Sequence, residues 1–274
     1  MKNFFLRLRT LTLTLTLTLI ACHSRDSKNT SENYIRVGTI SGPETKLMAV
    51  AKKVALQQFG LKVKIIEFTD YTMPNQALED DQIDANVFQH YPFLLSQVKQ
   101  HGYSIASVGD TFLYPMGLYS RTLKSITDLK PGSKVAIPND PSNEARALLL
   151  LEKAKLITLK SHVTINATTR DIKGNPYHLN IIAMDAAQLP RALEDVAIAA
   201  INTNFAIPAG LSPSHALFAE QTDSPYMNLI VVRAADRNLK RTKELVEAYQ
   251  SAPVLAEAKK LFGDAAVAGF KVRS

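Results

Sequence analysis

The chain has 274 residues, of which 46% are hydrophobic and 21% are charged. These proportions are typical of a folded globular protein and exclude collagen-like, disordered and multi-span membrane chains. The length suits one large domain or two lobes with separate cores. The single cysteine excludes a disulfide framework, a zinc ribbon and an iron–sulfur cluster. The formal net charge of +7 would fit a nucleic-acid partner, but the basic residues are unevenly placed.

Residues 1–21 predict a secretory signal peptide. Lys2, Arg7 and Arg9 precede a run of Leu and Thr from Leu11 to Ile20. A basic start, an apolar run of about ten residues and small residues at its end are the three parts of such a signal. The Leu–Thr alternation by itself favours a strand, but the flanking residues favour the signal. The run is shorter than the roughly 20 residues that a transmembrane helix needs.

The signal ends in Leu19-Ile20-Ala21-Cys22, which resembles the lipobox of bacterial lipoproteins. The resemblance implies cleavage before Cys22 and lipid on its sulfur, where several acyl chains give stable anchoring. A buried free cysteine is the less favoured alternative.

Cleavage removes three of the 32 basic residues, which leaves 29 against 25 acidic residues and a net charge of +4. We therefore expect no nucleic-acid partner. Residues 22–33 are then the lipidated cysteine and a flexible tether. We expect a lipid-anchored protein at the cell membrane, facing the periplasm or the cell exterior.

After the tether, strand patterns alternate with helix patterns. Ile35–Ile40 is a β-branched run, and the capping box Ser41–Glu44 predicts the start of a helix that ends at Gly60. Asp140 and Pro141 have the residue types of an N-cap and a first helical position. The other predicted strands or extended segments are 61–68, 85–88, 103–108, 112–120, 134–138, 179–184, 196–201 and 228–233, and the other predicted helices are 74–81, 91–100, 141–155, 187–193, 239–250 and 253–262.

This alternation predicts an α/β protein with mainly parallel sheets covered on both faces. We expect two lobes, the first formed by 34–116 plus 229–274 and the second by 117–228. The chain would cross between them near 112–120 and 226–233. Ligands of such sheets bind beyond the carboxyl ends of the strands, near helix N-termini, so an interlobe cleft is the expected binding site.

The sequence offers no recognisable catalytic motif. It has no P-loop, no dinucleotide-binding glycine motif, no His-Glu-x-x-His and no Gly-x-Ser-x-Gly. His90 and His101 are too far apart for a metal pair on one turn, and the acidic group Asp80, Asp81 and Asp84 lacks the spacing of an EF-hand. We therefore expect no catalytic residues, no metal and no cofactor, and an enzyme is the least favoured class.

One candidate anion receptor is present. Arg146 lies about a turn and a half into the helix that Asp140 is expected to cap, where a guanidinium fork and the helix dipole together favour a carboxylate. A surface salt bridge with Glu144 or Asp140 is an equally good interpretation from these local facts.

Other candidate residues lie at strand ends. Asn202 and Asn228 could bind the ammonium and carboxylate of an amino acid, although asparagine at such positions is usually a turn residue. Tyr71, Phe88 and His90 could wall an apolar pocket, although aromatic side chains there are more often part of a core.

Eight segments in the same order resemble the NlpA/MetQ family, the methionine-binding lipoproteins of ABC importers, over about residues 35–262. The resemblance implies a two-lobed periplasmic-binding-protein fold, with Arg146 on the ligand carboxylate and Asn202 and Asn228 on its backbone groups. The segments are 35–44 (IRVGTISGPE), 70–78 (DYTMPNQAL), 83–94 (IDANVFQHYPFL), 111–120 (TFLYPMGLYS), 135–151 (VAIPNDPSNEARALLLL), 186–193 (AAQLPRAL), 197–206 (AIAAINTNFA) and 224–233 (SPYMNLIVVR).

The same resemblance places Tyr71, Phe88 and His90 in a side-chain pocket. We also expect Asn143, in the polar segment that holds Arg146, to bind the ligand. The sequence departs from the family at Tyr91, Ala145 and Phe205. The implied function is capture of methionine (the L- or D-form, or a methionine dipeptide) by a monomer that delivers it to an ABC permease with its ATPase. A surface interaction protein such as an adhesin, with the same fold, is the alternative.

Overall fold

The computed structural model describes residues 33–221 and 224–272. The predicted signal peptide, Cys22 and the tether up to residue 32 lie outside the described residues. Strands β1 to β13 form a six-stranded sheet in the order β13-β4-β12-β3-β1-β2, a five-stranded sheet in the order β11-β5-β10-β6-β9 and a two-stranded ribbon of β7 and β8. No helix in these residues is long and apolar enough to cross a membrane.

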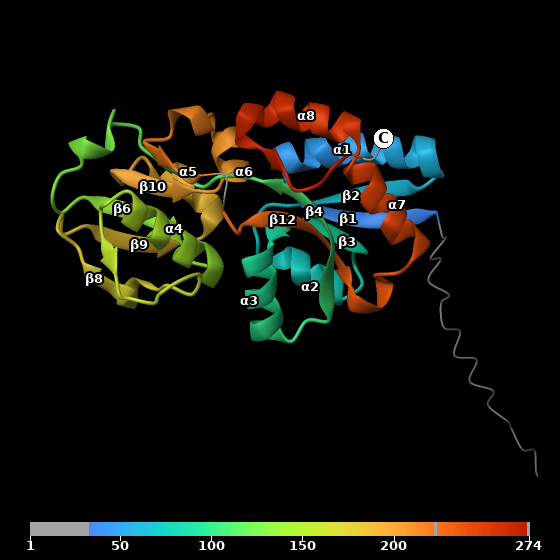
Figure 1. Ribbon diagram of the computed structural model, residues 1–274, viewed down its shortest axis with the longest axis horizontal. Coiled ribbons are helices and arrows are strands. Elements are labelled where there is room, and N and C mark those ends of the chain that lie inside the picture. Colours follow the sequence, from blue (N-terminus) through green and yellow to red (C-terminus); the bar gives the residue numbers. More distant parts are fainter. Residues whose placement is uncertain (1–32, 222–223, 273–274) are drawn as a thin grey trace, which may run out of the picture. The chain divides into compact units, whose positions relative to one another are not determined.

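The six-stranded sheet has helices on both faces (Figure 1). One face carries α1 (Pro43–Phe59), which packs against α7 (Lys240–Tyr249) and α8 (Ala252–Phe262), and their shared core includes Val37, Leu47 and Tyr249. The other face carries α2 (Met73–Glu79) and α3 (Tyr91–His101). The strands are β1 (Tyr34–Ile40), β2 (Lys62–Phe68), β3 (Ala85–His90), β4 (Ile105–Leu113), β12 (Met227–Arg233) and β13 (Val267–Ala268).

The five-stranded sheet has its own core, which includes Val135, Leu148, Leu151 and Ile198. Helix α4 (Pro141–Lys153) packs against β6 and supplies the two leucines, while α5 (Leu189–Ala192) packs against β10. A short helix, α6 (Thr203–Ala206), follows β10. The strands are β5 (Gly117–Tyr119), β6 (Lys134–Pro138), β9 (Asn180–Met184), β10 (Ile198–Ile201) and β11 (Phe218–Ala219), and the ribbon is β7 (Thr158–Leu159) with β8 (Ile172–Gly174).

The chain leaves the first sheet after β4, enters the second at β5, and returns from β11 to β12. The α/β class is as expected, but the sheets are mixed rather than mainly parallel. Strand β1 is parallel to β2 and β3, and β6 is parallel to β9 and β10, whereas β12 is antiparallel to β3 and β4, and β5 is antiparallel to β10 and β11. The difference arises because β4, β5, β11 and β12 flank the two passages between the sheets, where the chain direction reverses.

The predicted capping box at the start of α1 is wrong. The N-cap is Gly42 at a φ of 131°, and it makes no side-chain cap hydrogen bond. Such a φ is accessible to glycine and strained for other residues. The turn directs the Ser41 hydroxyl to Glu67 Oε2 at 2.6 Å and leaves Glu44 buried in the interior. By contrast, the predicted cap of α4 is confirmed, since Asp140 Oδ1 accepts a hydrogen bond from Asn143 N at 3.0 Å.

Candidate functional site

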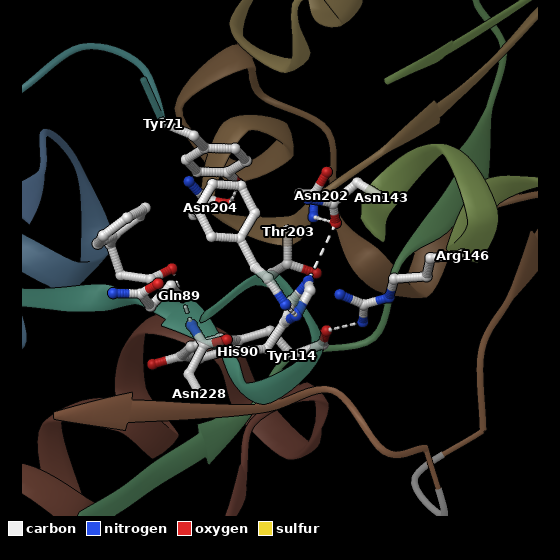
Figure 2. A pocket seen from close by; sticks show the side chains of 12 residues that line it. Tyr71, Gln89, His90, Tyr114, Asn143, Arg146, Asn202, Thr203, Asn204 and Asn228 are labelled. Carbon is white, nitrogen blue, oxygen red and sulfur yellow. Dashed lines mark hydrogen bonds between the residues drawn. The ribbon is translucent and has the colours of Figure 1, made fainter. Parts of the chain in front are cut away.

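A pocket lies where the ends of several elements from both sheets meet (Figure 2). Strand β3 ends in Phe88-Gln89-His90, Asn202 follows β10, and Asn228 lies near the start of β12. The cavity is narrow in this structure, with a volume of about 20 Å³. The lining residues are Tyr71, Phe88, Gln89, His90, Phe93, Tyr114, Asn143, Arg146, Asn202, Thr203, Asn204 and Asn228.

All seven residues predicted to bind the ligand line this pocket. Five further residues line it that were not predicted: Gln89, Phe93, Tyr114, Thr203 and Asn204. Thr203 and Asn204 directly follow Asn202 at the end of a strand, so their position was an available signal. Tyr114 lies in the passage after β4, where no local pattern separates it from a core residue.

Arg146 is buried in the wall of the pocket and is not a surface residue. Its pairing with Glu144 or Asp140 is contradicted, because its Nε donates to Glu220 Oε1 at 2.9 Å and its Nη2 donates to Glu220 Oε2 at 2.5 Å. Nη2 also donates to the Tyr114 carbonyl oxygen at 2.8 Å. Among the described residues, no hydrogen bond uses Nη1, and this arm of the guanidinium points toward Thr203 and His90 (Figure 2).

His90 joins the two sides of the pocket. Its Nδ1 accepts a hydrogen bond from Phe93 N at 3.1 Å and so caps α3. In a neutral imidazole the proton is then on Nε2, which donates to Asn143 Oδ1 at 3.2 Å. Burial, followed by the nearby charge of Arg146, lowers the pKa of His90 to about 3. The ring is therefore neutral at physiological pH.

The asparagine side chains that line the pocket differ in which of their polar atoms have hydrogen-bond partners within the protein. Asn143 is fully used within the protein, because its Oδ1 accepts from Asn202 Nδ2 at 2.9 Å as well as from His90, while its Nδ2 donates to both carboxylate oxygens of Asp140. Asn202 Oδ1 and Asn204 Nδ2 are buried without a hydrogen-bond partner in the described part of the chain. Asn143 is thus placed to orient Asn202 rather than to offer a free group.

Asn228 is oriented by groups behind the pocket. Its Nδ2 donates to Glu44 Oε1 at 3.2 Å and to the Phe88 carbonyl oxygen at 3.4 Å. These two bonds use the amide nitrogen and leave its Oδ1 as the atom available to a ligand. Burial raises the pKa of Glu44 well above its usual value, against the opposing effect of the Asn228 hydrogen bond.

An aromatic cluster forms the apolar wall of the pocket. The Tyr71 ring centroid lies 5.9 Å from those of Phe88 and Phe93 and 5.0 Å from that of Phe205. The Tyr71 hydroxyl donates to Asn204 Oδ1 at 2.7 Å. Phe205 does not line the pocket but supports Tyr71 from behind. The other two departures from the family lie outside the lining as well, since Tyr91 is exposed and Ala145 is fully buried.

A buried network of amide side chains fixes Gln89. Asn75 Nδ2 donates to Gln89 Oε1 at 2.9 Å, and Asn75 Oδ1 accepts from Gln89 Nε2 at 2.6 Å and from Asn86 Nδ2 at 2.9 Å. Gln89 Nε2 also donates to Asn86 Oδ1 at 2.9 Å. A satisfied polar network of this kind makes its surroundings rigid, so the end of β3 and the start of α2 form a preorganised part of the site.

The protein has two sheets with separate cores, and a pocket with polar and aromatic walls lies at the ends of their strands. This arrangement is that of a binding protein for a small polar molecule. The chain matches the family described as NlpA lipoprotein over residues 35–270. It is 45% identical to the D-methionine-binding lipoprotein MetQ of Escherichia coli (strain K12), with 92% of this chain and 93% of that protein covered. The chain belongs to the NlpA lipoprotein family.

Solved structures are similar over nearly the whole described region. An ABC transporter periplasmic substrate-binding protein from Coxiella burnetii is 58% identical, with a TM-score of 0.83 and coverage of 86% of this chain and 100% of that one. A nutrient-binding protein from Burkholderia cenocepacia bound to methionine is 51% identical, with a TM-score of 0.84 and the same coverage of both chains.

Proposed function

We propose that this protein captures methionine outside the cytoplasm and delivers it to an ABC permease. The observation that carries the proposal is the set of free groups in the pocket, since Arg146 Nη1 and Asn204 Nδ2 can donate while Asn202 Oδ1 and Asn228 Oδ1 can accept. Two donors suit a carboxylate and two acceptors suit an ammonium group. The relatives named for methionine support the same ligand.

In this proposal the carboxylate, the ammonium group and the thioether of methionine contact different residues of the pocket. Arg146 holds the carboxylate, and Asn202 and Asn228 hold the ammonium group. Tyr71 and Phe88 enclose the thioether, where a sulfur–aromatic contact contributes ~0.3–1.5 kcal/mol. His90 and Asn143 complete the binding set, because they fix the orientation of Asn202.

Calorimetry tests the proposal. Protein that has been unfolded, dialysed and refolded to remove bound ligand is titrated with L-methionine and D-methionine. Asn202→Ala is compared with Asn180→Ala, at an exposed position of β9. Loss of a hydrogen bond to a charged group predicts a fall in affinity of about tenfold or more for Asn202→Ala and no change for Asn180→Ala. Absence of binding by the wild-type protein to either form would refute the proposal.

The cellular part of the proposal concerns the anchor and the partner. We infer that Cys22 carries lipid and holds a monomer at the membrane, with 34–116 plus 229–274 and 117–228 as the two lobes presented to the permease. Cys22→Ser should move the protein from the membrane to the soluble fraction and abolish incorporation of labelled fatty acid. Retention of Cys22→Ser in the membrane fraction would contradict this anchor.

A further inference from the structure

The charge of Arg146 is already paired before any ligand binds. Both carboxylate oxygens of Glu220 accept hydrogen bonds from Arg146, and the two side chains are only 3% and 8% exposed. Glu220 Oε2 also accepts from Met116 N at 2.9 Å. The ring of Tyr226 covers the guanidinium, with the guanidinium carbon 4.3 Å from the ring centroid. Glu220 is therefore a buried, fully bonded partner and not a flexible surface acid.

This pairing decides which part of Arg146 a ligand can reach. Nε and Nη2 form the edge of the fork that usually binds a carboxylate with two parallel hydrogen bonds, and here Glu220 occupies that edge. A ligand carboxylate is left with the Nη1 side, which faces Thr203 and His90 (Figure 2). The pair also holds the guanidinium in one orientation, so less entropy is lost when a ligand binds.

The pairing also decides the net charge that the ligand meets. Of the twelve residues that line the pocket, Arg146 alone is charged, since His90 is neutral and the rest are amides, hydroxyls or aromatic rings. Glu220 cancels that charge from behind. Asp140, behind Asn143, accepts three hydrogen bonds from Asn143, and burial raises the pKa of its carboxyl group, which disfavours a further negative charge there.

A site with no net charge discriminates against a charged ligand. An amino-acid zwitterion brings one positive and one negative group and finds a partner for each. An anion of the same shape without the ammonium group would leave its charge uncompensated in a largely buried pocket, which is costly.

We propose that Glu220 is the specificity-determining counter-ion of Arg146, which makes the pocket select the zwitterion of an amino acid over the corresponding carboxylate anion. The inference rests on the proposed function, since Arg146 is taken as the receptor of the ligand carboxylate. Glu220 lies outside the pocket and acts through Arg146, so it is a positioning and charge-balancing residue.

The test compares two ligands that differ only in the ammonium group, L-methionine and 4-(methylthio)butanoate. The wild-type protein should prefer methionine strongly. In Glu220→Gln, Arg146 lacks its counter-charge. The preference for methionine should then fall by about tenfold or more, because the ammonium group of the ligand loses the attraction of the Glu220 charge. The ion pair of the half-buried Glu257 with the exposed Lys260 supplies the control, since Glu257→Gln should leave the ratio unchanged.

A second variant protects the test against misfolding. Glu220→Ser leaves room for water to hydrate the guanidinium, and it should lower the same ratio if Glu220→Gln does not fold. A merely structural role of Glu220 would weaken both ligands alike and leave the ratio unchanged in the folded variants, and that result would overturn the inference alone. Failure of the wild-type protein to bind methionine would instead refute the proposed function, and the inference with it.

Discussion

Acidification should destabilise the protein through His90. The buried ring has a pKa of about 3 in the folded state, whereas an exposed histidine in the unfolded chain titrates near 6.5. Below pH 6.5 the unfolded chain therefore takes up a proton that the folded protein does not, and stability falls by about 1.4 kcal/mol per pH unit until the pH approaches the folded value. Between pH 7 and pH 5 the loss amounts to about 2 kcal/mol.

The perturbation that isolates this effect is His90→Asn. Asparagine is among the best N-cap residues, so it can replace Nδ1 as the acceptor for Phe93 N, while the bond from Nε2 to Asn143 is lost at every pH. The free energy of unfolding is measured by urea denaturation at pH 7 and pH 5. The difference between wild type and variant should shift by about 2 kcal/mol in favour of the variant at pH 5, because all other titrating groups are common to both proteins.

The control is His178→Asn. His178 is exposed and has a φ of 48°, a conformation that asparagine tolerates. Its replacement should change the free energy of unfolding by the same amount at both pH values. If the pH effect of His90→Asn were no larger than that of His178→Asn, the neutral, buried state of His90 would be refuted.

Three further predictions concern the groups around the pocket. Burial raises the pKa of Glu44, so folding must protonate this acid and stability falls as the pH rises above the unfolded value near 4.5; Glu44→Gln should be more thermostable than wild type at pH 8, and the gain should vanish near pH 4. Asn75→Ala leaves buried amide groups of Gln89 without partners and should lower the free energy of unfolding by on the order of 2 kcal/mol in urea denaturation, with a parallel loss of methionine affinity in calorimetry. Tyr71→Phe keeps the ring but removes the hydrogen bond to Asn204, so calorimetry should give a fall in methionine affinity of about fivefold; an unchanged affinity would mean that Asn204 is held in place without Tyr71.

The sequence predicted the site better than it predicted the contacts within it. Asn202 and His90 follow predicted strands and Arg146 lies in the first turns of a predicted helix, which is where ligands of such sheets bind. These positions left the role of each residue open, and the family resemblance assigned it. The partner of Arg146 was not predictable in this way. Glu220 lies 74 positions further along the chain, in a segment without a motif, and local reasoning offered only the nearby acids Glu144 and Asp140.

Local rules failed where tertiary contacts outweighed them. The spacing of Ser41 and Glu44 fits a capping box, but the φ of Gly42 turns the serine toward Glu67 and the burial of Glu44 beside Asn228 removes the second half of the box. The predicted cap at Asp140 is confirmed, because the capping residue and its helix are adjacent in the chain.

The alternation of strands and helices and the capped start of α4 depend on neighbouring residues, so they can be predicted from the amino-acid sequence. The same holds for the placement of amides and aromatic side chains at strand ends. The sequence also shows that the net charge of +7 is unevenly distributed, because three basic residues and no acidic residue lie in the predicted signal peptide. The folded structure was needed to find that the sheets are mixed, that His90 is neutral and bonded to Asn143, and that Glu220 pairs with Arg146. These properties depend on burial and on contacts between segments far apart in the chain, which no local pattern encodes.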